Sequence, residues 1–331
     1  MALSISIAMC TFNGGEFLPL QLASIAGQKR LPEELVVCDD GSSDGSLEAL
    51  HEFARLAAFP VRIVRNERNL GSTKNFNQAI SLCTGEIVVL ADQDDIWYPH
   101  KLAAIQAAFE NPSAPITVFS DADLIDENGR TLGLSLWQSF SFGLRDQKRF
   151  ANGEALHILV KHPVVTGATM AFRREFFHLI SPIPPNQVHD NWIAFLLAAC
   201  GPFTLVPESL MQYRRHQNQQ IGPGRVSLRE RIARARSTGP DFYLQEIMRF
   251  RQFYERLERR RADFPFAECA LREISAKISH REHRALLPRT GAARIPKVIR
   301  EILNGGYWRY SEGWESVAKD MAGVFDNRNP E

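Results

Sequence analysis

The segment VLADQDDIWYPHKL, residues Val89–Leu102, joins a hydrophobic run to three carboxylates that stand within four residues. The run IVVLA at Ile87–Ala91 predicts a buried strand, and Asp92, Asp94 and Asp95 follow it directly. Like charges this close disfavour ionisation of one another, so such a cluster at the end of a buried strand is costly. Either a bound cation offsets the repulsion, or the segment is a solvated turn in which Asp95 caps the next helix.

The composition bounds the protein class. With 331 residues, 44% apolar and 23% charged, the chain is long enough for one large domain and an appendage. The five cysteines are scattered without a C-x-x-C pair, so we expect no structural zinc, no disulfide framework and a reducing compartment. Met1–Ile7 enters a strand pattern without a basic leader, which predicts no signal peptide and a cytoplasmic location. The longest apolar stretch, Trp192–Val206, is broken by Gly201-Pro202 and is too short to span a bilayer.

Charge is distributed unevenly along the chain. Residues 1–224 carry a net charge of −6, residues 225–300 carry +10, and residues 301–331 carry −3. Interleaved apolar residues in Ser227–Arg300 predict amphipathic helices, and their charge has two interpretations. It is either a solvated helical face or a surface attracted to anionic lipid headgroups. Binding to nucleic acid is not expected, because no motif supports it and the rest of the chain is acidic.

The first half of the chain alternates strand and helix patterns. Strands are predicted at Ser4–Met9, Glu34–Asp40, Val61–Asn66, Glu86–Ala91 and Ile116–Asp121, with helices at Phe17–Gly27, Gly45–Ala57, Ser72–Cys83 and Lys101–Glu110. This order is typical of an α/β fold with a mostly parallel central sheet flanked by helices. Ligands of such sheets bind beyond the carboxyl ends of the strands. The acids that follow strands here are Asp39, Asp40, Asp92, Asp94, Asp95, Asp121 and Asp123.

The second half is less regular. Asp126–Gly129 predicts a hairpin turn, and residues 130–160 show no clear pattern. His162–Phe177 reads as a strand that enters a helix, and Trp192–Val206 as a helix, a turn and a strand. Asp121 and Asp123 lack calcium-loop spacing and are interpreted as structural.

Asp92 and Asp94 form a D-x-D pair that suits one hard divalent cation. Mg²⁺ and Mn²⁺ are held by one or two carboxylates while substrate phosphates supply further oxygens. The pair is therefore a candidate site for a divalent metal cofactor, and the solvated turn remains the alternative for a D-x-D pair taken alone.

Eight segments match, in order, the pattern of a known family. They are AMCTFNGGEFL (Ala8–Leu18), VVCDDGSSDGS (Val36–Ser46), RNLGSTKNFNQAI (Arg68–Ile80), ADQDDIWYPHKL (Ala91–Leu102), FSDADLIDENG (Phe119–Gly129), VTGATMAF (Val165–Phe172), HDNW (His189–Trp192) and YRRH (Tyr213–His216). The chain resembles the family 2 glycosyltransferases, which have the GT-A nucleotide-diphospho-sugar fold, and most of all the bacterial polysaccharide and rhamnosyltransferase-like members. The resemblance implies a GT-A domain over residues 1–224, with a nucleotide-binding half (1–115) and an acceptor half (116–224). Residues 225–331 would form a basic helical extension.

The resemblance assigns residues to the nucleotide. Asp39 would accept a hydrogen bond from N3–H of uracil or thymine, a donor that adenine lacks, while Asp40 braces the loop. The alternative for Asp39–Asp44 is a capped turn. The full set implied for the nucleotide pocket is Thr11, Phe12, Glu16, Asp39, Lys74, Asn75 and Asp92.

The resemblance also assigns the chemistry. Asp190 would be the catalytic base, or alternatively the N-cap of the Trp192 helix. Asp94 and His216 would bind the metal, Arg214 would contact the diphosphate, and Gly167 would let the sugar approach the backbone. The YRRH segment departs from the family pattern, because Arg215 stands where Gln is expected and Gln219 where Asn is expected.

Together these features predict an inverting, metal-dependent glycosyltransferase. It would move a sugar from a dTDP- or UDP-sugar, with dTDP-L-rhamnose favoured by resemblance, to a surface polysaccharide or lipid-linked oligosaccharide. Peripheral contact with the inner face of the cell membrane would run through residues 225–300. The alternatives are a metal-dependent phosphohydrolase or nucleotidyltransferase, and a non-catalytic sugar-nucleotide-binding protein.

Overall fold

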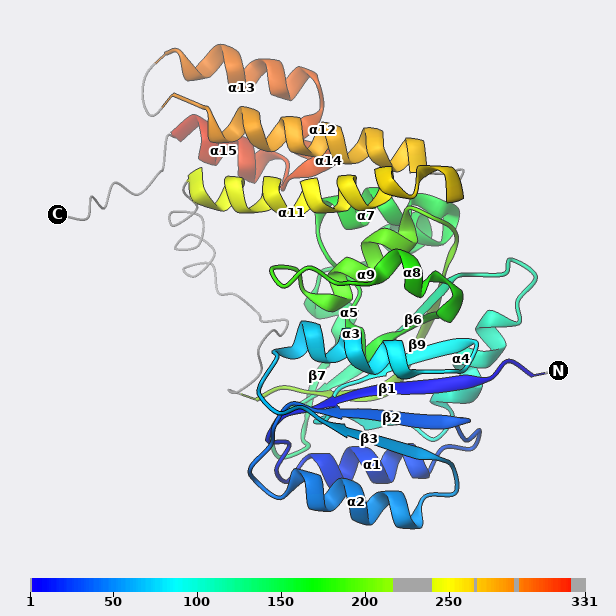
Figure 1. The fold of residues 1–331 in the computed structure, drawn as a ribbon. Coiled ribbons are helices and arrows are strands. Elements are labelled where there is room, and N and C mark those ends of the chain that lie inside the picture. Colours follow the sequence, from blue (N-terminus) through cyan, green and yellow to red (C-terminus); the bar gives the residue numbers. More distant parts are fainter. Residues whose placement is uncertain (1, 217–239, 265–266, 289–291, 323–331) are drawn as a thin grey trace. The chain divides into compact units, whose positions relative to one another are not determined.

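The computed structural model describes residues 2–216, 240–264, 267–288 and 292–322 (Figure 1). Its contacts divide the chain into two compact units. Unit 1 comprises Met1–Ala155 and Val164–Pro223, and unit 2 comprises Leu156–Pro163 and Gly224–Glu331.

Unit 1 is built on one nine-stranded sheet. The strands in spatial order are β3 (Val61–Arg65), β2 (Glu34–Asp39), β1 (Ile5–Thr11), β4 (Ile87–Ala91), β8 (Met170–Arg173), β6 (Thr117–Ile125), β9 (Phe203–Arg214) and β5 (Ile96–Trp97), and β7 (Thr131–Ser135) pairs with β6. The helices are α1 (Leu18–Ala26), α2 (Ser46–Leu56), α3 (Ser72–Leu82), α4 (Lys101–Phe109), α5 (Leu136–Ser139), α6 (Leu144–Arg149), α8 (Phe177–Ile180) and α9 (His189–Ala198). Helices α1 and α2 cover one face of the sheet and α3 covers the other (Figure 1).

The strand directions confirm the predicted α/β architecture. Strand β8, which lies between β4 and β6, runs in the opposite direction to both. Strands β3, β2, β1 and β4 are paired in parallel, and β9 is parallel to β6. Because β8 is antiparallel to both β4 and β6, those two strands point the same way, so six strands share one direction. The carboxyl ends of β1 and β2 are in register at Thr11 and Asp39, beside the end of β4, so the acids that follow these strands share one edge.

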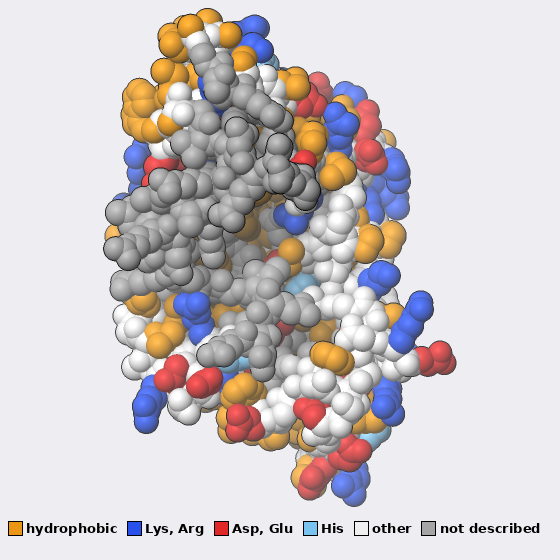
Figure 2. Space-filling view, turned by 90° about the vertical axis from the view of Figure 1, so that its left-hand side faces the viewer, with side chains coloured by type: hydrophobic (Ala, Val, Ile, Leu, Met, Phe, Trp, Pro, Cys, Tyr) orange, Lys and Arg blue, Asp and Glu red, His pale blue; other side chains and the backbone are white. Residues whose placement is uncertain are grey.

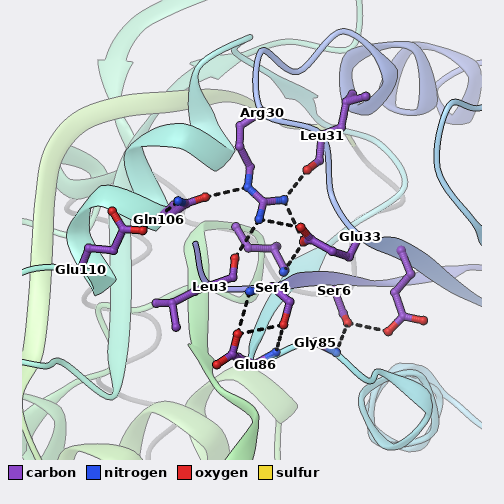
Figure 3. A network of polar contacts seen from close by, with 12 residues as sticks. Leu3, Ser4, Ser6, Arg30, Leu31, Glu33, Gly85, Glu86, Gln106 and Glu110 are labelled. Atoms are coloured by element: carbon purple, nitrogen blue, oxygen red, sulfur yellow. Dashed lines mark hydrogen bonds and ion pairs between the residues drawn. The ribbon is translucent and has the colours of Figure 1, made fainter. Parts of the chain in front are cut away.

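The opposite, amino-terminal edge of the sheet carries a network of satisfied charges (Figure 3). Arg30 donates to both carboxylate oxygens of Glu33 at 2.9 and 3.0 Å, and to the carbonyl of Leu3 at 2.8 Å. Glu86 accepts from the Ser4 amide at 2.9 Å. Partial burial opposes ionisation of Glu33, yet the hydrogen bonds from Arg30 and from the Ile5 amide hold its pKa below the usual value. The carboxylates of this edge are therefore stabilised as anions.

The segment without a clear sequence pattern is held by aromatic packing. Phe119, on β6, contacts Trp137, Phe142 and Phe150 at ring-centroid distances of 5.5, 6.3 and 5.1 Å. Such contacts join positions far apart in the sequence. They therefore do not require the regular spacing of apolar residues that predicts a helix or a strand. The predicted hairpin is confirmed, because β6 and β7 pair antiparallel around Gly129, whose φ is 77°.

Unit 2 is helical. It contains α7 (Ala155–Lys161, of which Ala155 lies in unit 1), α11 (Pro240–Arg259), α12 (Ala267–Ala285), α13 (Arg294–Leu303), α14 (Gly306–Tyr310) and α15 (Trp314–Ala322). Among the described residues, no helix has the length and apolar character that crossing a bilayer requires.

Part of the basic charge of unit 2 is internal. Lys277, Arg281 and Arg284 lie on one face of α12 and are 0%, 7% and 3% exposed. Lys277 and Arg281 pair with Glu246 at 3.3 and 2.7 Å, and Arg284 pairs with Asp320 at 2.7 Å. These three cations are buried within unit 2, so they belong neither to a solvated helical face nor to a lipid-facing surface, and membrane contact through the other basic residues stays a prediction.

This network yields a stability prediction. Asp320 is 1% exposed and accepts from Arg284 at 2.7 and 3.0 Å and from the Tyr307 hydroxyl at 2.7 Å. Asp320→Ala leaves a buried guanidinium without its acid, so the free energy of unfolding should fall by about 3–5 kcal/mol. Urea denaturation followed by circular dichroism measures this loss.

The matched control is Arg309→Ala. Arg309 pairs with Glu273 at 2.7 Å, but its side chain is 55% exposed. An exposed pair contributes up to about 1 kcal/mol, so this variant should unfold near the wild-type midpoint. Equal losses in the two variants would contradict the importance assigned to the buried pair.

Candidate active site

The D-x-D segment is held beside the end of β9 by strand pairing. Ile96 and Trp97 of β5 pair antiparallel with Gln212 and Met211 of β9. This pairing brings Asp94 to the residues that follow β9, and its Oδ2 lies 2.7 Å from His216 Nε2. Two residues predicted as metal ligands, 122 positions apart, are therefore in direct contact.

Arg214 has a different place from the predicted one. It is 2% exposed, and its guanidinium donates to the carbonyls of Asp94 at 2.8 Å, Asp126 at 3.2 Å and Glu127 at 3.1 Å. The guanidinium also lies 4.6 Å from the centre of the Phe17 ring. Arg214 thus fixes the loop that carries the acids, and its contact with the diphosphate stays a prediction.

A buried lysine stands among the acids. Lys101, at the start of α4, is 0% exposed and donates to the Ala168 carbonyl at 2.7 Å. Its ammonium lies 4.0 Å from the centre of the Trp97 ring. Burial lowers the pKa of Lys101 to about 7, while the charges of Asp95 and Asp92 oppose that shift.

The acids of this edge differ from those of the amino-terminal edge. Burial, with repulsion from Asp94 and Asp190, raises the pKa of Asp92 to about 7, although Lys101 counteracts this. Asp95 is 1% exposed, and burial, with repulsion from Asp94 and Asp92, raises its pKa well above the usual value. Asp95 Oδ1 accepts from the Arg214 amide at 3.1 Å, whereas its Oδ2 is buried without a hydrogen-bond partner. A positive charge at this site would offset the repulsion among Asp92, Asp94 and Asp95.

Asp190 stands in the first turn of α9. Its Oδ1 accepts from its neighbour's amide, Asn191, at 2.6 Å, and its Oδ2 accepts from the Gly167 amide at 3.3 Å. Its charge is close enough to raise the pKa of Asp92. The residue immediately before the helix is Val188, so Asp190 lies inside the first turn and is not the N-cap.

Gly167 and His189 pack together behind Asp190. A Cβ on Gly167 would lie 2.8 Å from His189 Nε2, so the histidine fills the space beside this glycine. The packing of His189 is thus one reason for a glycine at this position, and approach of the sugar to the Gly167 backbone stays a prediction. His189 is 8% exposed and stacks on Phe76 at a centroid distance of 4.0 Å, and both its ring nitrogens are buried without a hydrogen-bond partner. Burial lowers its pKa, against the attraction of Asp190, and favours the neutral ring.

The predicted nucleotide residues divide into buried supports and exposed candidates. Asp39 is 0% exposed and accepts from the Thr11 hydroxyl at 2.9 Å, the Ser42 hydroxyl at 2.5 Å, and the amides of Gly41 and Ser42 at 3.2 and 2.9 Å. These four donors match the four acceptor positions of a carboxylate. Recognition of a base by Asp39 therefore stays a prediction, and it would require one of these donors to be exchanged.

Asp40 and Asn75 hold the neighbouring loop. Asp40 accepts from Asn66 at 2.8 Å and from the amides of Leu70 and Gly71 at 2.8 and 2.9 Å, as the predicted brace should. Asn75 is 1% exposed and donates to the Cys38 carbonyl at 2.8 Å. Asn75 thus supports the loop from within, and its predicted place in the nucleotide pocket stays a prediction.

Phe12, Glu16 and Lys74 are exposed at the same edge and stay candidates for nucleotide contacts. The Phe12 amide donates to Gln93 Oε1 at 2.8 Å, and Gln93 Nε2 donates to the Phe12 carbonyl at 3.0 Å. This reciprocal pair ties the end of β1 to the D-x-D segment. A Cβ on Gly14 would lie 2.8 Å from Gln93 Oε1, which explains the glycine beside it.

Sequence reasoning missed Gln93, Lys101 and His189. Gln93 is the middle residue of the D-x-D segment, and its residue type alone did not indicate a role. Lys101 looks like a surface cation at the start of a helix, and only its burial beneath the acids reveals its role. His189 precedes the predicted base, and that adjacency was the one available signal.

The donor set fits a divalent cation. A carboxylate and an imidazole lie 2.7 Å apart at Asp94 and His216, beside the unpartnered oxygen of Asp95. Among the described residues no group of three or more His, Cys, Asp or Glu side chains is placed to hold a metal ion. A site with few protein ligands suits Mg²⁺ or Mn²⁺, which retain positions for water and phosphate.

Comparison with known proteins identifies the family. The sequence profile of the family described as Glycosyl transferase family 2 matches residues 6–180, more than half of the chain. The chain belongs to glycosyl transferase family 2. An uncharacterized glycosyltransferase of a Nostoc species is 28% identical over 222 residues, which make up 65% of this chain and 65% of that protein. One of Methanocaldococcus jannaschii is 25% identical over 211 residues, covering 63% of this chain and 70% of that protein. The match therefore spans slightly less than two thirds of the Nostoc relative.

Solved structures agree on the fold of this family 2 member. The Staphylococcus aureus TarS 1–349 complex with UDP-GlcNAc superposes with a TM-score of 0.58 at 17% identity, covering 97% of this chain and 89% of that one. The mannosyltransferase PcManGT from Pyrobaculum calidifontis, in complex with GDP-Man and Mn²⁺, superposes with a TM-score of 0.54 at 16% identity, covering 98% and 85%. The predicted GT-A fold is thereby confirmed.

The raised pKa of Asp92 predicts a pH dependence of stability. In the unfolded chain this carboxyl releases its proton near pH 4, whereas in the folded protein it does so near pH 7. Between these values the folded state holds more protons, so its stability falls as pH rises and levels off above pH 7. Asp92→Asn should remove this contribution.

The measurement is the free energy of unfolding of both proteins from pH 4.5 to 7, with a chelator present. The stability of wild type relative to Asp92→Asn should decline across the range. A difference that is constant with pH would contradict the raised pKa.

Proposed function

We propose that this protein is an inverting, metal-dependent glycosyltransferase that uses a nucleotide-diphospho-sugar donor. The observation that carries the proposal is the meeting of two chemically different groups at one sheet edge. Asp94 and His216 supply metal ligands 2.7 Å apart, and Asp190, from a separate segment, is near enough for its charge to act on Asp92. A displacement at an anomeric carbon needs these two functions, one for the leaving diphosphate and one for the attacking hydroxyl.

Asp94 and His216 would hold the cation, with Asp92 beside it towards the ribose. The bound ion supplies positive charge that stabilises the diphosphate as it leaves. Arg214 contributes by fixing the Asp94 backbone, and Lys101 offsets the remaining negative charge from within the protein. These two interactions help the folded protein to hold several carboxylates close together.

Asp190 would act as the general base. Its Oδ1 and Oδ2 accept from backbone amides at 2.6 and 3.3 Å, which orients the carboxylate. As the acceptor oxygen forms its bond to the anomeric carbon, the bond from that carbon to the diphosphate breaks. The hydroxyl proton passes to the carboxylate of Asp190, and the configuration of the sugar inverts.

For the donor we propose a UDP- or dTDP-sugar, with dTDP-L-rhamnose as the first to test. The support is the loop of Asp39 and the exposed Phe12, Glu16 and Lys74 around it. Among the structures with the same fold, TarS was solved with UDP-GlcNAc and PcManGT with GDP-Man, so the fold accommodates both pyrimidine and purine donors. A panel of nucleotide sugars with Mn²⁺, read by thermal shift, discriminates between them.

For the acceptor we propose a hydroxyl of a surface polysaccharide or a lipid-linked oligosaccharide. The protein would act in the cytoplasm, in peripheral contact with the inner face of the cell membrane. Its five cysteines are all free, which fits a reducing compartment.

Asp94→Asn tests the metal assignment. Loss of the charged ligand should remove the metal-dependent part of nucleotide binding, so the Kd for UDP or dTDP should become the same with Mn²⁺ and with EDTA. Isothermal titration calorimetry measures both values. Asp241→Asn, an exposed aspartate on α11, is the matched control and should keep the wild-type response to Mn²⁺. Wild-type enhancement by Mn²⁺ in Asp94→Asn would show that the ligand lies elsewhere.

Asp190→Asn tests the base. The amide keeps the size of the carboxylate but accepts no proton, so kcat should fall by about 10²- to 10⁴-fold. Donor affinity should stay within about threefold, because the nucleotide and metal groups are intact. Release of the nucleoside diphosphate from the accepted donor measures turnover. Turnover near the wild-type rate would place the base on another residue.

A further inference from the structure

Lys101 is a lysine buried inside unit 1. Lysines and arginines lie mostly at the surface of proteins, as the blue side chains in Figure 2 show for one face of this one, yet Lys101 is 0% exposed. It stands in the first turn of α4. Burial of an ammonium opposes folding unless the group gains partners inside the protein, so the partners of Lys101 indicate what it does.

Three neighbours surround the Lys101 ammonium. It donates to the carbonyl of Ala168 at 2.7 Å, lies 3.2 Å from Sδ of Met211, and stands 4.0 Å from the centre of the Trp97 ring. A thioether is a weak acceptor, and an aromatic face offers no lone pair, so the Ala168 carbonyl is the strong acceptor of the three. A methionine would fill the same space without a buried charge, so packing alone does not account for a lysine here.

The segment that Lys101 contacts is the turn of residues 166–169. The amide and the hydroxyl of Thr169 donate to the Thr166 carbonyl at 3.1 and 3.0 Å, which closes the turn. Ala168 and Thr169 are each 1% exposed. Because the peptide units are planar, anchoring the Ala168 carbonyl and closing the turn at Thr166 together restrict the direction of the Gly167 amide between them.

The Gly167 amide is the link from this turn to the proposed base. It donates to Asp190 Oδ2 at 3.3 Å, while Asp190 Oδ1 accepts from the amide of its neighbour Asn191 at 2.6 Å. The hydrogen bond from Gly167 therefore joins the carboxylate to a segment outside α9. A general base works only within hydrogen-bond reach of the proton that it takes, so the direction of this carboxylate matters.

We propose that Lys101 is a positioning residue for the transfer step. Its ammonium anchors the turn of residues 166–169, and the Gly167 amide of that turn directs the Asp190 carboxylate towards the acceptor hydroxyl. Lys101 acts through these groups and not by contact with the substrate. This inference rests on the proposed function, because it takes Asp190 as the base.

Lys101→Met is the first test, since methionine keeps a long unbranched side chain but removes the charge and the donors. The assay is nucleoside diphosphate release from the most active donor of the nucleotide-sugar panel, with saturating Mn²⁺. We expect kcat to fall about 10- to 100-fold, because a small displacement of a reacting group has costs of this size. The KM for the donor should stay within about threefold. A wild-type kcat, or a loss confined to KM, would overturn the proposal.

The double variant Lys101→Met/Asp190→Asn tests whether Lys101 acts through Asp190. Once the base is removed its direction has no further effect, so the double variant should turn over within about threefold of Asp190→Asn. Losses that multiply would show that Lys101 acts by another route. Wild-type turnover of Asp190→Asn would overturn the proposed base together with this inference, whereas a loss in Asp190→Asn but not in Lys101→Met would overturn this inference alone.

Hydrogen exchange of residues 165–170, followed by mass spectrometry, reports on the turn without any substrate. The amides of Gly167 and Thr169 should exchange faster in Lys101→Met than in wild type, because the turn has lost its anchor. Lys101→Arg keeps the charge and a donor, so it should retain more of the wild-type protection and kcat than Lys101→Met. Unchanged exchange in Lys101→Met would contradict the anchoring role.

The matched control is Lys277→Met. Lys277 is also 0% exposed and donates to a carbonyl, that of Tyr310 at 2.9 Å, but it belongs to unit 2. Its substitution should leave kcat and the exchange of residues 165–170 as in wild type. Circular dichroism establishes that each variant is folded. An equal loss of kcat in Lys277→Met would show that the effect comes from removing any buried lysine, and would overturn the proposal.

Discussion

The interaction on which the site depends is the burial of the Lys101 ammonium beneath the carboxylates that follow β4. Its charge favours ionisation of Asp92 and Asp95, while its own pKa is lowered by burial to about 7. The same ammonium donates to the Ala168 carbonyl at 2.7 Å, next to the turn whose Gly167 amide donates to Asp190. One side chain therefore connects the acidic segment after β4 to the turn that holds the Asp190 carboxylate. Because Lys101 is in the first turn of α4, the amino-terminal end of this helix must pack against the sheet edge that carries the acids.

The two ends of the sheet differ in how their carboxylates are stabilised. At the amino-terminal edge, hydrogen bonds from Arg30 and backbone amides lower the pKa of Glu33, and the carboxylate is stabilised without any ligand. At the carboxyl-terminal edge, the pKa values of Asp92 and Asp95 are raised, and one oxygen of Asp95 is buried without a partner. Groups with raised pKa values in an ordinary core would be replaced by apolar residues at a gain in stability. Their presence here fits a site completed by a cation and a diphosphate.

How far the sequence predicts this structure depends on the range of the interactions. The strands that end at Thr11, Asp39 and Ala91 were predictable, because their apolar runs and following turns are local signals. The contact of Asp94 with His216 was implied by family resemblance, and the pairing of β5 with β9 is what produces it. The burial of Arg214 was not predictable, because an arginine beside a histidine reads as a phosphate ligand until its three carbonyl partners are known.

Other features depend on contacts between distant segments, which produce no regular spacing of apolar residues in the sequence. The aromatic cluster around Phe119 joins segments that are distant in the chain. The buried cations of α12 look, in sequence, like the exposed cations of α13, and only their acidic partners Glu246 and Asp320 distinguish them. The net charge of a segment therefore does not show which of its cations are exposed.

The most direct test of the account is anomalous diffraction from crystals soaked with Mn²⁺ and UDP or dTDP. The account predicts a manganese peak within about 2.5 Å of Asp94 Oδ2 and His216 Nε2, with the diphosphate completing its ligands. If Asp94 and His216 were still paired with each other, and the density between the acids and the nucleotide held no ion, the proposed reason for crowding three carboxylates after β4 would be wrong.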